Sequence, residues 1–118
     1  MNKESLTAKL LDLAEGRETP ETWQNWWDEH ETELEALLSR GEFLKLKPCR
    51  HGFQWVPVFG SQKGAIAILE KSGLAFEASN LYQERYLAEL DAFCKEQERM
   101  QREKQKEFKA SHPELFGR

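Results

Sequence analysis

The side chains of this 118-residue chain that could do chemistry are few, and the most suggestive are Cys49 and His51. They are separated by one residue, so a single turn could offer a thiolate and an imidazole to a metal ion or a substrate. Zinc needs four ligands, and Cys94, His30 and His112 are scattered without a ligand spacing. A cysteine nucleophile needs an oriented base and a third group. We therefore expect no metal, no cofactor and no enzyme, with a small Cys/His enzyme as an alternative.

Two further patterns resemble parts of enzyme sites. Glu29 and Glu33, and likewise Asp28 and Glu31, can face each other on a helix. Acid–base catalysis by paired carboxylates requires burial to separate their pKa values, and these residues are expected opposite an apolar stripe, so we interpret them as solvated charge. The segment Gly60–Gly64 has two glycines and a lysine but lacks the spacing of a Walker phosphate loop. We expect it to be a turn.

Charge is distributed unevenly along the chain. The formal net charge is −4, but residues 18–42 carry eight acidic residues and one basic residue, whereas residues 51–118 carry ten of each. Such an acidic segment repels nucleic-acid phosphates and attracts a basic protein surface. We therefore expect a protein partner and no nucleic acid.

The sequence shows no secretory signal, and no apolar run approaches the length of a membrane span. The expectation is a cytoplasmic protein without membrane contact. Its two cysteines, Cys49 and Cys94, should then be reduced thiols.

The segment from Thr19 to Gly41 predicts an amphipathic helix over residues 20–40. Trp23, Trp26 and Trp27 follow a 3.6-residue period, which the later leucines continue. Thr19 can cap this helix, the proline after it suits the first helical position, and Gly41 is a stop signal. A second capping signal leaves two helices with a joint near residue 30 open as an alternative.

The aromatic stripe of this helix is expected to be core, because an apolar stripe at helical spacing is more often buried than used as a ligand platform. Trp27 lies at the edge of the stripe and could be an exposed interface anchor. The acidic back of the helix is the predicted partner surface. The predicted partner-binding residues are Asp28, Glu29, Glu31, Glu33, Glu35 and Trp27.

Other helices are expected on both sides of this segment. Ser5–Glu15 predicts a short helix that Gly16 ends, and Ser79-Asn80 can cap a long C-terminal helix. Residues 65–71 fit a helix or a strand, and we prefer the helix. Residues 95–109 carry six bases and four acids with two large apolar groups, which predicts a helix extension that protrudes, frays or pairs with a second copy.

Strands are expected in the middle of the chain. Residues 42–47 and 53–59 predict a hairpin, with Pro57 placing its second strand at a sheet edge, and residues 74–78 predict a third strand. The predicted fold class is α+β, with N-terminal helices packed on a small, largely antiparallel sheet and a long C-terminal helix. Residues 1–95 are expected to form one compact domain, and residues 96–118 a charged extension with a tail.

The first half of the chain resembles small uncharacterised bacterial proteins, some of which look like immunity proteins of polymorphic or contact-dependent toxin systems. The residues that carry the resemblance are Gly16, Thr19, Pro20, Glu21, Trp23, Trp26, Trp27, Leu34, Glu35, Leu37, Leu38, Phe43, Leu44 and Leu46. The resemblance implies an immunity protein that neutralises a basic toxin such as a nuclease. The alternative is a dimeric bacterial or phage adaptor or structural protein that uses the long C-terminal helix.

Overall fold

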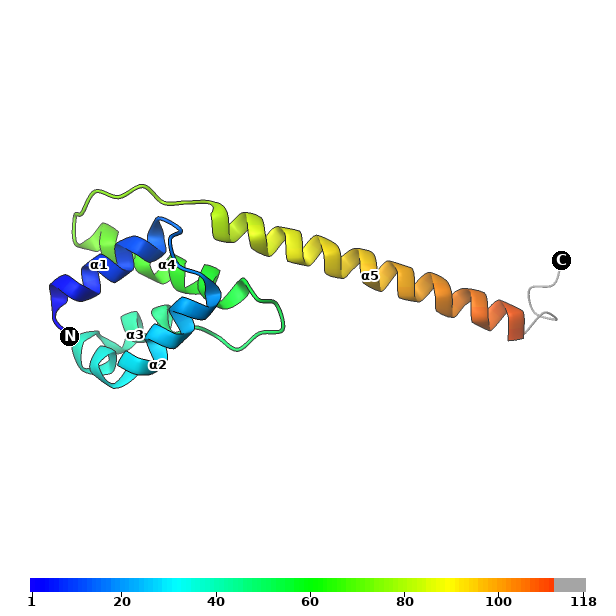
Figure 1. The fold of residues 1–118 in the computed structure, drawn as a ribbon, viewed down its shortest axis with the longest axis horizontal. Coiled ribbons are helices and arrows are strands. Elements are labelled where there is room, and N and C mark those ends of the chain that lie inside the picture. Colours follow the sequence, from blue (N-terminus) through cyan, green and yellow to red (C-terminus); the bar gives the residue numbers. More distant parts are fainter. Residues whose placement is uncertain (112–118) are drawn as a thin grey trace.

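The computed structural model describes the backbone of residues 1–111 and the side chains of residues 1–106, and this part of the chain is entirely helical. Its helices are α1 (Lys3–Ala14), α2 (Pro20–Leu37), α3 (Arg40–Leu46), α4 (Val56–Lys71) and α5 (Leu81–Ser111) (Figure 1). No strand occurs in the described residues. The predicted α+β class with an antiparallel sheet is therefore wrong.

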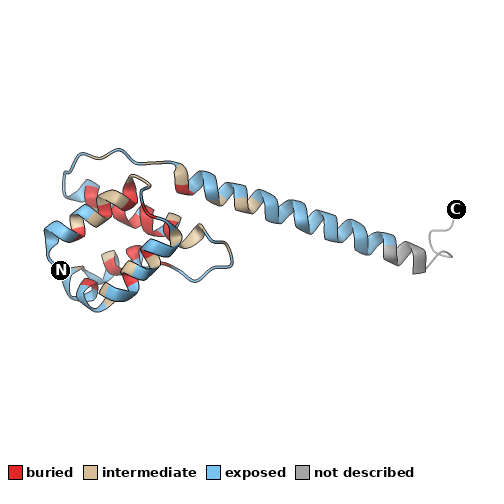
Figure 2. Ribbon diagram, in the orientation of Figure 1, coloured by how far each residue is buried: buried red, intermediate tan, exposed pale blue. Residues whose placement is uncertain are grey.

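Four helices form a body, and the fifth leaves it as a rod. Helix α1 lies along α4, while α2 and α3 form a second layer against α4 (Figure 1). Helix α5 touches the body through α4 and then continues into solvent for most of its length. The whole helix is about 46 Å long at 1.5 Å per residue. Buried residues are confined to the body and the first turn of α5 (Figure 2).

The N-terminal helices agree with the sequence signals. Helix α1 ends just before Gly16, which adopts a φ of +79° that side chains with a Cβ rarely tolerate. Thr19 caps α2 by accepting the backbone N–H of Thr22, whose hydroxyl accepts the N–H of Thr19 in return. Helix α2 runs without a joint at His30, as the single-helix prediction has it, but it ends at Leu37 and not at the predicted residue 40.

The first predicted strand, residues 42–47, is helix α3. Ser39 accepts the backbone N–H of Glu42 while the Glu42 carboxylate accepts the N–H of Ser39, a reciprocal capping box that starts a helix. Phe43 and Leu46 are buried three residues apart, which is the spacing of one helix face. Gly41 lies inside this helix and is not the stop of α2.

The second predicted strand, residues 53–59, is a bend followed by the start of α4. Pro57 occupies the first turn of this helix, where its missing N–H needs no partner. The predicted turn at 60–64 lies within α4, as does the predicted helix at 65–71, which is confirmed. The third predicted strand, residues 74–78, is an irregular connection that follows Gly73.

A close helix crossing explains one glycine of α4. A Cβ built on Gly64 would lie 2.6 Å from the backbone carbonyl oxygen of Lys45. Real Cβ atoms do not approach backbone atoms so closely, so α3 and α4 can cross at this distance only where α4 carries glycine.

The protruding end of α5 agrees with the expectation for the charged segment. Every residue from 91 to 106 is exposed. Arg99 pairs with Glu103 at 2.7 Å within the same helix, which supports the helix without tertiary contacts. Residues 112–118, including His112 and the end of the predicted 96–118 extension, lie outside the described residues.

Candidate functional site

Helix α2 is held on the body by its aromatic stripe. Trp23 and Trp27 are each 1% exposed, and the Trp27 ring lies 5.2 Å from that of Phe43 on α3. Trp26 is partly buried and stacks on Trp23 with ring centroids 5.2 Å apart. The core interpretation of the stripe is therefore confirmed for Trp23. The expected exposure of Trp27 is wrong, because its ring is buried against Phe43 and is not presented at the surface as an anchor.

The five predicted acidic residues do not share one face. At 100° per residue, Asp28, Glu31 and Glu35 lie along one flank of α2, the flank that faces α3. Glu29 points away from the body, and Glu33 lies on the opposite flank near the N-terminus. The structure thus brings together three of the five residues and separates the other two.

Two of these carboxylates already have a cation. Glu31 pairs with Lys47 at 3.3 Å, and Glu33 accepts the amino group of Met1 at 2.8 Å. The hydrogen bond and charge of that amino group lower the pKa of Glu33 below its usual range.

The remaining acidic residues of α2 lack such a cation. Asp28 accepts a hydrogen bond of 2.9 Å from the amide of Gln24, which leaves its charge uncompensated. No cation of the described chain lies within 4.0 Å of Asp28, Glu29 or Glu35. These three residues, together with the exposed Glu21 in the first turn, carry negative charge that no cation of the described residues pairs with.

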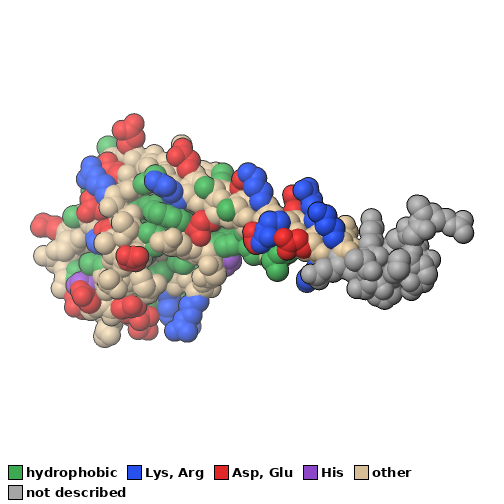
Figure 3. Space-filling view, turned by 45° about the vertical axis from the view of Figure 1, so that its right-hand side comes forward, with side chains coloured by type: hydrophobic (Ala, Val, Ile, Leu, Met, Phe, Trp, Pro, Cys, Tyr) green, Lys and Arg blue, Asp and Glu red, His purple; other side chains and the backbone are tan. Residues whose placement is uncertain are grey.

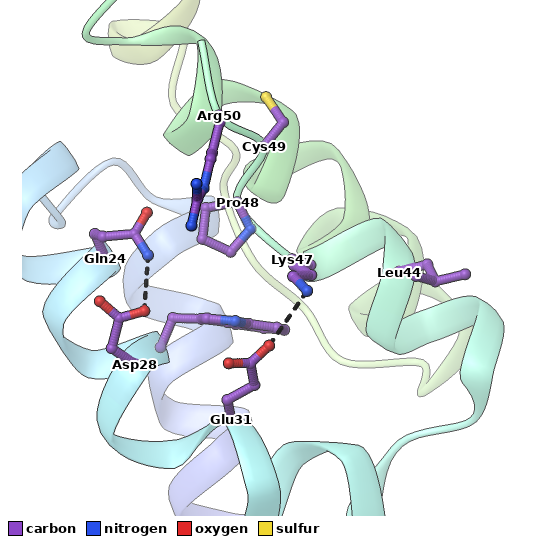
Figure 4. Close-up of a pocket in the computed structure, with 9 residues that line it drawn as sticks. Gln24, Asp28, Glu31, Leu44, Lys47, Pro48, Cys49 and Arg50 are labelled. Carbon is purple, nitrogen blue, oxygen red and sulfur yellow. Dashed lines mark hydrogen bonds and ion pairs between the residues drawn. The ribbon is translucent and has the colours of Figure 1, made fainter.

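A cleft of about 740 Å³ separates α2 from the end of α3 and the segment after it (Figure 4). Asp28 and Glu31 form its acidic wall, and Lys47 and Arg50 form the opposite, basic wall. The cleft is lined by Gln24, Trp27, Asp28, Glu31, Leu44, Lys47, Pro48, Cys49 and Arg50. Because the Glu31–Lys47 pair bridges the walls, the cleft is charged on both sides and partly neutralised.

The Cys49–His51 turn has no catalytic geometry in the described chain. Both residues are exposed, and no hydrogen bond joins them. His51 instead accepts the backbone N–H of Phe53 through Nδ1 at 3.0 Å, which fixes the bend before α4. The Cys49 sulfur points away from the acidic wall of the cleft (Figure 4).

Metal ligands are equally dispersed. Across the described part of the chain no group of three or more His, Cys, Asp and Glu residues is placed to hold a metal ion. His30 donates from Nδ1 to the carbonyl of Trp26 within α2. Cys49 and Cys94 are both exposed and are not joined to each other.

Sequence reasoning missed the polar contacts that attach α5 to the body. The buried hydroxyl of Tyr82 donates to the carbonyl of Glu18 at 2.8 Å and accepts the N–H of Glu18 at 2.9 Å. The Glu89 carboxylate accepts the N–H groups of Gln54 and Trp55 at 2.7 and 2.6 Å. A carboxylate of α5 therefore holds the backbone that leads into α4, whose N-cap residue Trp55 makes no side-chain capping hydrogen bond.

Gln62 makes a third polar contact that sequence reasoning missed. Its amide donates to the carbonyls of Ala14 and Ser79, each at 2.9 Å, and thereby ties the connection before α5 to the end of α1. The available sequence signals were a glutamine within the apolar run of α4, and a glutamate at position 89 in register with Tyr82, Tyr86 and Phe93.

Comparisons with protein-family models, with curated proteins and with solved structures find no match to this chain. None of the described helices is long and apolar enough to cross a lipid bilayer. Function has to be inferred from the residues themselves.

Proposed function

We propose that this chain is a protein-binding module whose partner is a basic protein domain. The most concrete form of the proposal is a cytoplasmic immunity protein that neutralises a basic toxin such as a nuclease. The observation that supports it most directly is the exposed charge of Asp28, Glu29 and Glu35 on α2, which no cation of the described residues pairs with.

Rigidity of α2 supports this role. The helix is capped at its first turn and anchored by Trp23 and Trp27, so its carboxylates are displayed on a fixed frame. Because a preorganised surface loses little conformational entropy on binding, more of the electrostatic attraction remains available for association. Leu44, 58% exposed beside the Glu35 flank, offers an apolar contact next to the charge.

The first test is protection. The chain should be co-expressed with the C-terminal domain of the protein encoded immediately upstream, and growth should be recovered from the toxicity of that domain. Failure to protect, with no complex between the two purified proteins, would remove the immunity assignment.

The second test locates the surface. Charge complementarity acts mainly on the association rate and is screened by salt, so Asp28→Lys with Glu35→Lys should slow association with the toxin domain about tenfold or more at low salt. Glu70→Lys with Glu77→Lys makes the same change in net charge at exposed positions away from α2 and should leave the rate nearly unchanged. An association rate that changes neither with salt concentration nor with the α2 charge reversals would place the interface elsewhere.

A further inference from the structure

Helix α5 carries apolar side chains into solvent. Leu87, Phe93 and Met100 are 49%, 48% and 40% exposed, and Leu90 between them is only partly buried. At 100° per residue, all of them lie within about 80° of Leu90 around the helix axis. Arg99 lies on the opposite side. We call the residues Leu87, Leu90, Phe93, Cys94, Gln97, Met100 and Lys104 the α5 stripe.

The body covers only one edge of the α5 stripe. Phe53 packs against Tyr86 and Phe93, with ring centroids 6.3 and 5.3 Å apart, and Phe59 packs against Tyr86. Beyond Phe93 no described helix packs on α5 (Figure 1). Since most helical stability in proteins comes from packing an amphipathic face, this length of exposed stripe indicates a partner helix.

Charge along α5 identifies that partner. Residues 81–98 contain five acidic and two basic residues, whereas residues 99–106 contain four basic and one acidic residue. Figure 3 shows charged side chains of both signs along the rod, with apolar surface where the rod leaves the body. Two copies of α5 side by side and antiparallel would place each acidic half beside the basic half of the other, whereas parallel copies would place like charges together.

We propose that two copies of the chain associate through their α5 stripes as an antiparallel helix pair centred near Gln97. The sign of the charge changes between residues 98 and 99, and the midpoint of α5 lies at residue 96. The charge pattern and the helix length therefore agree on one register. The two bodies would lie at opposite ends of the pair, where they cannot collide.

This register gives a neighbour to Phe93 and Met100, two of the three exposed apolar residues. Phe93 and Cys94 face the partner's Met100 and Gln101, and Leu90 faces the aliphatic stem of the partner's Lys104. Asp91 on the flank faces the partner's Arg102. Gln97 meets its own copy at the centre, and a polar residue at such a position favours one register over its neighbours. The acidic flank of α2 is not used, so this inference is independent of the proposed function.

Cysteine crosslinking tests the direction of the pair. In the full chain with Cys49→Ser and Cys94→Ser, single cysteines would be placed by Leu90→Cys, Gln97→Cys or Lys104→Cys and oxidised mildly. Disulfides form only when Cβ atoms approach to about 4 Å. The antiparallel pair predicts a covalent dimer from Gln97→Cys alone, and a mixed dimer when the Leu90→Cys and Lys104→Cys chains are combined.

Other crosslinking patterns would overturn the proposal. Self-linked dimers from all three variants would show a parallel pair. No dimer from any variant, together with a single-chain mass in sedimentation equilibrium at millimolar concentration, would show that a different molecule covers the stripe.

Charge reversal tests whether charge complementarity sets the antiparallel direction of the pair. Asp91→Lys with Glu98→Lys leaves residues 81–98 with four basic and three acidic residues, so both halves of α5 are net positive. Arg102→Glu with Lys104→Glu leaves residues 99–106 with three acidic and two basic residues, so both halves are net negative. Each variant alone should self-associate about tenfold or more weakly, whereas their equimolar mixture should form a heterodimer. Circular dichroism would verify that both remain helical. A mixture that associates no better than either variant alone would refute the charge argument.

Discussion

The hydroxyl of Tyr82 should be one of the main attachments between α5 and the body. Tyr82 is 0% exposed, and its hydroxyl bonds both backbone groups of Glu18. Tyr82→Phe keeps the ring, which packs 5.9 Å from that of Trp55, and removes only these two bonds. Tyr86→Phe is the matched control, because no hydrogen bond of the Tyr86 hydroxyl occurs within the described residues.

The expected loss follows from what the substitution leaves behind. A buried backbone N–H and a buried C=O would lose their partner, and each unsatisfied buried group costs about 1–3 kcal/mol. We expect Tyr82→Phe to lower the free energy of unfolding by about 2–4 kcal/mol at pH 8. Tyr86→Phe should change it by less than about 0.5 kcal/mol.

The same contact predicts that the stability of the protein falls at alkaline pH. Burial raises the pKa of Tyr82 to about 12 from 10, and the nearby carboxylates of Glu18 and Asp12 act in the same direction. Because the folded-state pKa is above the unfolded value, this stabilisation is complete below pH 10 and is lost as the pH rises through 12. At pH 11 about 1.4 kcal/mol should be gone, and phenylalanine at this position abolishes that loss.

Urea unfolding followed by tryptophan fluorescence at pH 8, 10 and 11 would measure both effects. The gap in unfolding free energy between the native chain and Tyr82→Phe should narrow by about 1.4 kcal/mol between pH 8 and 11. Equal stability at pH 8 would refute the attachment. A gap that does not change with pH would refute the raised pKa.

Three other predictions concern residues of the helical body. Gly64→Ala places a Cβ 2.6 Å from a backbone carbonyl of α3 and should lower the free energy of unfolding by about 1–3 kcal/mol. Gly60→Ala has open space around it and should not destabilise the protein, and thermal melts would compare the two variants. Trp23→Ala should cost about 3–5 kcal/mol, and an unchanged melting temperature would contradict its burial. Cys49→Ser with His51→Ala should change stability little, and elemental analysis of the native chain should find no stoichiometric zinc; one zinc per chain would overturn our interpretation of this turn.

Several elements follow from short-range signals that the sequence displays directly. Thr19 and the proline after it start α2, and Gly16 ends α1. The 3.6-residue spacing of the apolar stripe that contains Trp23 predicts which side of α2 is buried. The charge of residues 95–106 likewise predicts that α5 continues into solvent, because such a segment has too little apolar surface to pack. In each case the deciding contacts join residues within one or two helical turns.

The predicted strands were wrong where a local signal had two meanings. Pro57 fits the edge of a sheet and also the first turn of a helix, and Ser39 with Glu42 offered a capping box that the apolar residues after it obscured. The short apolar runs around them fit a strand or a buried helix equally well. Packing of α3 against α4, and of α4 against α1 and α5, favours the helix at both places.

The sequence by itself determined the amphipathic helix α2, the end of α1 at Gly16, the Thr19 cap of α2, and the protruding charged end of α5. Only the tertiary structure decided that Trp27 is buried, that the flank of α2 with Asp28 and Glu35 faces α3, and that Glu89 binds the backbone N–H of Trp55 before α4 from 34 residues away. The physical reason is the range of the contacts. A cap or a helical period is complete within a few residues. The burial of a side chain, the neighbour that a helix flank faces and a hydrogen bond to a distant carboxylate all depend on which helices meet, and that is fixed only when the whole core packs.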